Sequence, residues 1–127
     1  MLLIRRLTIG LLCAQTEDLP IPPCSTGSVA AFCLFCDLVT ALDPRTGEAL
    51  WGPERTAQGT VSASPVVADG KLYVLNEHGV TTVLSAGPEY RHRATNQLDG
   101  SYTLSSPAVA GSQLFVRTGT HLYCLGH

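Results

Sequence analysis

Short apolar runs, separated by Gly, Asp, Asn or Pro, follow one another through the second half of the chain. The runs are rich in Val, Leu, Thr and Tyr, which favour strands. Outside the first 14 residues, no window has the apolar spacing of a helix. We predict a unit of four strands and three strands of a second unit, at residues 61–68, 71–76, 80–85 and 90–96, then 102–110, 113–118 and 122–125. Asp69-Gly70 predicts a tight hairpin turn between the first two strands.

The apolar pattern repeats with a 42-residue period, so that Ser64-Pro65 recurs as Ser106-Pro107. Segment 64–74 aligns with 106–116 without a gap, and short apolar segments beginning at residues 38, 80 and 122 align at the same spacing. A repeat of this length lies in the range of four-stranded propeller blades. We therefore predict an all-β chain, a partial β-propeller of about two four-stranded antiparallel blades with an irregular N-terminus.

Several strands contain consecutive apolar residues, such as Val66-Val67-Ala68, which predicts burial on both faces. Stacked propeller blades bury their strands in this way, and a two-layer sandwich is the alternative, although it would not require the repeat. We expect an irregular, targeting or degenerate blade segment at 1–36 and repeats at 37–127. A weak earlier copy of the first strand is expected at 23–32.

The N-terminus has some features of a signal peptide, because Arg5 and Arg6 precede a short apolar stretch. Leu12 stands where a small residue is preferred before a cut after Ala14, so a ragged or misassigned start is the alternative. No stretch approaches the roughly 20 apolar residues of a membrane span. The net charge of −2 and the lack of a basic run argue against nucleic acid as a partner.

One segment, residues 41–51, combines a turn with the only tryptophan of the chain. Asp43 follows a predicted strand, and its carboxylate can accept hydrogen bonds from the N–H groups of a turn. Gly47 can take the left-handed conformation that closes such a turn. We expect Trp51 to begin an outer strand and to bury its ring against the neighbouring blade.

This segment resembles the tryptophan-docking motif A-x-D-x-x-T-G-K-x-x-W of propellers of the pyrroloquinoline quinone (PQQ) type. Glu48 stands in place of the usual Lys, and the motif residues present are Ala41, Asp43, Thr46, Gly47 and Trp51. The resemblance covers residues 38–127 and implies the closing blades of a larger PQQ-like propeller. It implies a non-catalytic scaffold or protein-interaction segment of a bacterial protein, periplasmic or envelope-associated, whose partners are other blades or proteins.

Quinoprotein dehydrogenases of the same superfamily hold PQQ and calcium, and a remnant of such an enzyme is the alternative function. They often contain adjacent bonded cysteines, which this sequence lacks. The candidate acids Glu77, Glu89 and Asp99 fall in turns or an outer strand, and calcium needs six to eight oxygen ligands. We therefore predict no cofactor, no metal and no catalytic residue, and leave the small-molecule ligand open. A truncated product without independent function is a further alternative.

Cysteine and histidine spacings offer little further chemistry. Cys33 and Cys36 have redox-motif spacing, but no βαβ unit surrounds them, so we expect buried apolar cysteines, with a metal or redox role as the alternative. His78 and His121 fall one position apart under the 42-residue shift, in similar turns of successive units. We expect solvated turn histidines, with a metal-binding pair as the alternative.

Overall fold

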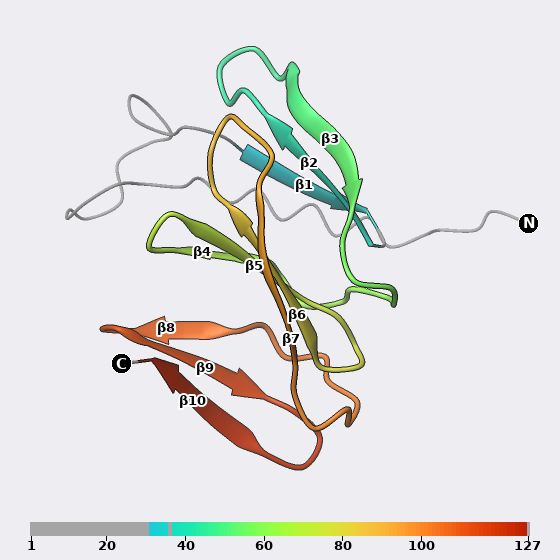
Figure 1. Cartoon of the computed structure of the whole chain (residues 1–127), viewed down its shortest axis with the longest axis vertical. Coiled ribbons are helices and arrows are strands. Elements are labelled where there is room, and N and C mark those ends of the chain that lie inside the picture. Colours follow the sequence, from blue (N-terminus) through green and yellow to red (C-terminus); the bar gives the residue numbers. More distant parts are fainter. Residues whose placement is uncertain (1–30, 36, 127) are drawn as a thin grey trace, which may run out of the picture.

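A computed structural model describes residues 31–35 and 37–126, which form ten strands in three antiparallel sheets (Figure 1). The first sheet contains β1 (Ala31–Phe35), β2 (Leu38–Leu42) and β3 (Ala49–Arg55) in that order. The middle sheet contains β4 (Val66–Ala68), β5 (Lys71–Leu75), β6 (Val80–Ser85) and β7 (His92–Gln97). The last sheet contains β8 (Ala108–Ala110), β9 (Gln113–Arg117) and β10 (Leu122–Gly126).

These segments are all-β, as the sequence predicts, and contain no helix that could span a bilayer. Figure 1 shows the sheets following one another along the long axis of the molecule, and no sheet among the described residues is closed. Two apolar cores join them. The core between the first and middle sheets contains Val39, Ala41, Val61, Leu72, Val74 and Leu84. The core between the middle and last sheets contains Ala63, Leu75 and Val116.

The 42-residue repeat is visible in where the strands begin. Strands β4 and β8 begin at residues 66 and 108, β5 and β9 at 71 and 113, and β6 and β10 at 80 and 122. In the β4–β5 turn, Asp69 and Gly70 have φ values of 48° and 66°, as a two-residue hairpin requires. Successive repeats therefore build successive sheets of similar design.

Two strands begin several residues later than the sequence predicts. The strand expected at 61–68 begins only at Val66, directly after the buried Pro65, and the strand expected at 102–110 begins only at Ala108, after the buried Pro107. Proline has no N–H with which to join a ladder, so each ladder starts after the proline. The residues before it still contribute to the cores, as Val61 and Ala63 do.

The pairing of the last hairpin differs from the 42-residue register by one position. Leu75 pairs with Thr81 in the middle sheet, whereas its equivalent Arg117 pairs with Leu122. The loop between the last paired residues of β9 and β10 is thus one residue shorter than that between β5 and β6, and it is Leu125 rather than Gly126 that pairs with Leu114. Because side chains alternate along a strand, this slip exchanges the two faces of β10 relative to the sequence alignment.

The first sheet begins before the boundary that the sequence predicts at residue 37. Strand β1 pairs with β2, with Phe35 opposite Leu38, and lies within the segment that the sequence predicts as an irregular, targeting or degenerate blade region. The apolar run of β1 gives it strand character. The signal-like start and most of the strand expected at 23–32 lie outside the described residues.

Replacing Leu72 by Ala tests the core between the first two sheets. Leu72 is fully buried, and we expect Leu72→Ala to lower the free energy of unfolding by about 2–5 kcal/mol, measured by chemical denaturation. The matched control is Leu104→Ala, because Leu104 is 55 % exposed and its truncation should cost no more than about 0.5 kcal/mol. Equal losses in the two variants would contradict the stacked arrangement.

Candidate functional site

The β2–β3 connection is a turn closed by its own polar groups. Asp43 Oδ1 accepts hydrogen bonds from the N–H of Arg45 at 2.8 Å and of Thr46 at 3.4 Å. The Gly47 N–H donates to the Asp43 carbonyl at 2.8 Å, and Gly47 has a φ of 75°. Thr46 Oγ1 accepts the N–H of Glu48 at 3.2 Å. Asp43, Thr46 and Gly47 thus fix the tight return of the chain from β2 to β3.

This return places Trp51 on β3 opposite the fully buried Ala41 of β2. The indole Nε1–H donates to the carbonyl of Gly87, in the β6–β7 connection of the middle sheet, at 2.9 Å. The Trp51 ring also meets Tyr90 edge to face, with centroids 5.3 Å apart and an interplanar angle of 66°. The half-buried indole packs against the core between the two sheets. All five motif residues therefore lie on one hairpin, and its tryptophan ties that hairpin to the next sheet.

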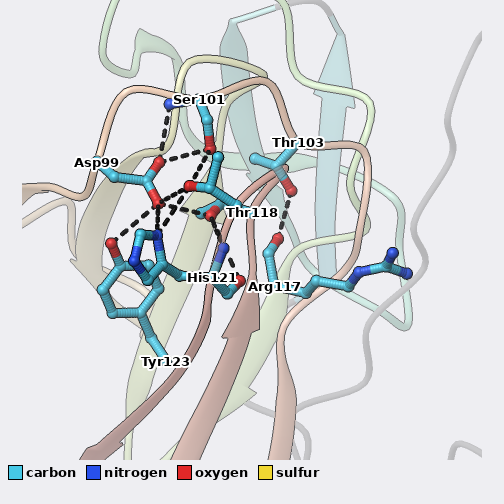
Figure 2. A network of polar contacts seen from close by, with 8 residues as sticks. Asp99, Ser101, Thr103, Arg117, Thr118, His121 and Tyr123 are labelled. Carbon is cyan, nitrogen blue, oxygen red and sulfur yellow. Dashed lines mark hydrogen bonds and ion pairs between the residues drawn. The ribbon is translucent and has the colours of Figure 1, made fainter.

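A second polar site, which we call the Asp99 cluster, lies where the chain passes from the middle to the last sheet (Figure 2). The Asp99 carboxylate accepts two hydrogen bonds from Ser101, from the backbone N–H at 2.8 Å and from Oγ at 2.6 Å. Further contacts come from the β9–β10 hairpin: Thr118 Oγ1 at 2.7 Å, Thr120 Oγ1 at 2.9 Å, His121 Nδ1 at 3.0 Å and Tyr123 OH at 3.0 Å. The cluster thus fastens the β7–β8 connection to that hairpin.

The electrostatics of the cluster favour an ionised Asp99. Hydrogen bonds from the hydroxyls of Ser101 and Thr118, in that order, hold the pKa of Asp99 far below its ordinary value, against the opposing effect of desolvation. Desolvation, followed by the hydrogen bond to Asp99, raises the pKa of Tyr123. At neutral pH the cluster is therefore a carboxylate surrounded by donors, and the Asp99 side chain is only 17 % exposed.

The hydroxyls of the Asp99 cluster are oriented for structure rather than for nucleophilic attack. A nucleophile of a Ser-His-Asp type bonds to the imidazole, which in turn bonds to the acid. Here Ser101 Oγ and Thr118 Oγ1 donate directly to Asp99, and His121 Nδ1 meets both Asp99 and Thr120. A carboxylate has about four acceptor positions. The contacts from Ser101, Thr118, Thr120, His121 and Tyr123 together occupy those of Asp99.

The other candidate residues are separate from one another. Glu77 accepts a hydrogen bond from Ser62 Oγ, and Glu89 pairs with Arg91 at 3.3 Å. Of the two candidate histidines, His78 is exposed in the β5–β6 connection, whereas His121 contacts Asp99. Within residues 31–35 and 37–126, no three His, Cys, Asp or Glu side chains form a possible metal site.

Within the described segments, the side chain of one cysteine, Cys124, is described. Cys124 on β10 is exposed and has a free thiol. Cys33 lies on β1, of which only the backbone is described, and Cys36 lies outside the described residues, so the expected burial of this pair stays a prediction.

The Asp99 cluster was not predicted, but the repeat contains a signal for it. Asn76 and Thr118 are equivalent positions of the 42-residue repeat, each directly after a strand. Asn76 Oδ1 accepts the N–H of Val80 at 2.9 Å, and its Nδ2 reaches the carbonyl of Gln58 at 3.0 Å. Thr118 likewise accepts the N–H of His121 at 3.1 Å and reaches back to Asp99. A polar residue that recurs at this position therefore indicates a hydrogen bond between the hairpin that contains it and the connection that precedes its sheet.

No protein-family model matches this chain, and a search of curated proteins finds no match to it.

Replacing Trp51 by Phe tests the link between the first two sheets. The ring contact with Tyr90 is kept while the bond to Gly87 is lost, so we expect the free energy of unfolding to fall by about 1 kcal/mol. Tyr90→Phe is the matched control, because it keeps a ring at the same contact, and we expect a change within about 0.5 kcal/mol. If Trp51→Phe unfolded at the same denaturant concentration as the wild type, the hydrogen bond to Gly87 would not stabilise the contact between the two sheets.

Replacing Asp99 by Asn tests the cluster through its pH dependence. The pKa of Asp99 is lower in the folded chain than in the unfolded chain, so its contribution is present above the ordinary aspartate pKa of about 3.9 and is lost as the pH falls below it. We expect acid to destabilise the wild type more steeply than Asp99→Asn, by up to about one proton taken up on unfolding.

The measurement for Asp99→Asn is denaturant unfolding at a series of acidic pH values. Glu48→Gln serves as the control, because Glu48 is an exposed acid in the β2–β3 connection, and its acid slope should follow the wild type. Identical slopes for wild type and Asp99→Asn would show that the cluster does not depress the Asp99 pKa.

Proposed function

We propose that this chain is a non-catalytic segment of a PQQ-like β-propeller, part of a larger propeller, that serves as a scaffold or protein-interaction surface. The observation that carries the proposal is the bond between Trp51 Nε1 and the Gly87 carbonyl. It joins one sheet to the backbone of the next, which is the role that the resemblance gives to this tryptophan.

The repeat architecture supports the same proposal. Each sheet contains strands of one copy of the 42-residue pattern and covers one face of its neighbour with apolar side chains. Propellers are built from four to eight such sheets around an axis. A stack of three fits a part of that arrangement, and its remaining surfaces fit a role in contacts with further sheets or proteins.

The arrangement of the acids supports a non-catalytic role. A calcium ion with PQQ needs six to eight oxygen ligands directed to one point. Glu77, Glu89 and Asp99 are instead engaged with different partners, namely Ser62, Arg91 and the cluster around Ser101 and Thr118. The described residues therefore do not fit the PQQ–calcium group.

Equilibrium dialysis with PQQ, with and without Ca²⁺, tests the proposal together with a dye-reduction assay. We expect no saturable calcium-dependent binding and no turnover. In the same preparation we expect the indole N–H of the single tryptophan to exchange slowly with deuterium in NMR spectra, because it is bound to Gly87. Calcium-dependent PQQ binding with dye reduction would favour the dehydrogenase remnant, and fast indole exchange would remove the docking on which the proposal depends.

A further inference from the structure

The last sheet has few buried residues of its own. Within residues 98–126, which lead into this sheet and form it, the buried residues are Thr103, Pro107, Val116 and Thr118. Val116 belongs to the apolar core shared with the middle sheet, whereas Thr103 and Thr118 are polar and each only 4 % exposed. Short strands need an apolar face packed on another element to be stable. The last sheet therefore depends on its contact with the middle sheet.

Hydrogen bonds make up much of this contact (Figure 2). The Asp99 carboxylate meets four groups of the β9–β10 hairpin. The segment that contains Asp99 is attached to the middle sheet, because the Leu98 N–H donates to the Gly79 carbonyl at 3.1 Å. Thr103 links the same two sheets, since its N–H donates to the Glu77 carbonyl at 3.0 Å and its Oγ1 to a β9 carbonyl at 2.6 Å. The Asp99 cluster thus spans the boundary between the middle and last sheets.

The boundary between the first and middle sheets is more apolar. Its core contains six buried residues, among them the fully buried Leu72, and Trp51 adds a hydrogen bond to Gly87. The core at the second boundary contains three buried residues. Separating the first two sheets therefore exposes more apolar surface and costs more free energy than separating the last two. Parts of a chain with few buried apolar contacts open more readily than the whole chain unfolds.

We propose that the last sheet detaches from the other two as one cooperative unit, and that the Asp99 cluster is the latch that keeps it closed. In the detached state the ladder of β8, β9 and β10 is lost, while the first and middle sheets stay stacked around Leu72. Detachment uncovers Ala63 and Leu75 of the middle sheet. The inference goes beyond the proposed function and does not depend on it, because it uses only the contacts between these sheets.

Native-state hydrogen exchange, followed by NMR on the full chain, tests the proposal with two matched amides. The Thr118 N–H donates to the His121 carbonyl at 2.8 Å in the last hairpin. Its repeat equivalent, the Asn76 N–H, donates to the Val80 carbonyl at 3.0 Å in the middle hairpin. We expect the Thr118 amide, together with the other protected amides of β9 and β10, to exchange through an opening at least about tenfold more frequent than the one that exposes Asn76.

Two variants separate detachment from global unfolding. Val74 lies in the first core and is 1 % exposed. Val74→Ala weakens sheets that stay folded in the detached state, so it should speed exchange at Asn76 and leave Thr118 unchanged. Asp99→Asn weakens the closed state alone, which is the starting point of both openings, so it should speed exchange at both amides by the same factor, about tenfold or more. Glu48→Gln is the control and should change neither amide.

Thiol labelling gives a second readout that does not depend on amides. Ala63 is 3 % exposed in the core that detachment uncovers. Residues 56–71, which cleavage after Arg55 and Lys71 releases, contain no cysteine, so this peptide reports the labelling of Ala63→Cys alone. We expect Asp99→Asn to accelerate the labelling and Val74→Ala to leave it unchanged.

One common opening for the Thr118 and Asn76 amides, accelerated equally at both by Val74→Ala, would overturn the inference, because the chain would then unfold in a single step. A separate opening of the last sheet that Asp99→Asn leaves unchanged would show that the Asp99 cluster is not the latch, which also overturns it.

Discussion

Each sheet of this chain buries apolar side chains on a neighbouring sheet, because three or four short strands cannot shield both of their own faces from water. Leu72 and Val74 on one side of β5, and Leu75 on the other, serve two different cores. The middle sheet is therefore held from both sides, and its position determines where the turns and the polar groups of the flanking sheets can meet.

Much of this arrangement follows from sequence patterns that obey a fixed period. Residues 80–85 form a strand within the predicted bounds, and the Asp69-Gly70 turn has the expected positive φ angles. The 42-residue spacing sets where corresponding strands begin. The burial of the Trp51 ring against the adjoining sheet was also predictable, since a large ring that follows a closed turn is buried most easily there.

Other features of the structure depend on residue pairings that the 42-residue period does not specify. Pro65 and Pro107 delay the start of the ladders, although the residues before them look equally strand-like. The last hairpin pairs one residue out of the repeat register, which puts Leu122 and Cys124 on the face of the last sheet that is turned away from the middle sheet. The Asp99 cluster joins residues 19 to 24 positions apart in the chain. Apart from Thr118, which recurs in the repeat as Asn76, these residues follow no sequence pattern, and only the folded hairpin directs them to one carboxylate.

The two interfaces are held by different chemistry. Between the first and middle sheets, Trp51 adds an aromatic contact and a hydrogen bond to a core of six buried residues. No tryptophan is available at the second interface, whose buried core has three residues. There, backbone groups make bonds between repeats, such as Ser64 N–H to Ser106 Oγ at 2.9 Å and Thr103 N–H to the Glu77 carbonyl at 3.0 Å. Hydrogen bonds need defined geometry. The Asp99 cluster fixes the segment that enters the last sheet. It therefore keeps these donors and acceptors aligned at the interface that has the smaller apolar core.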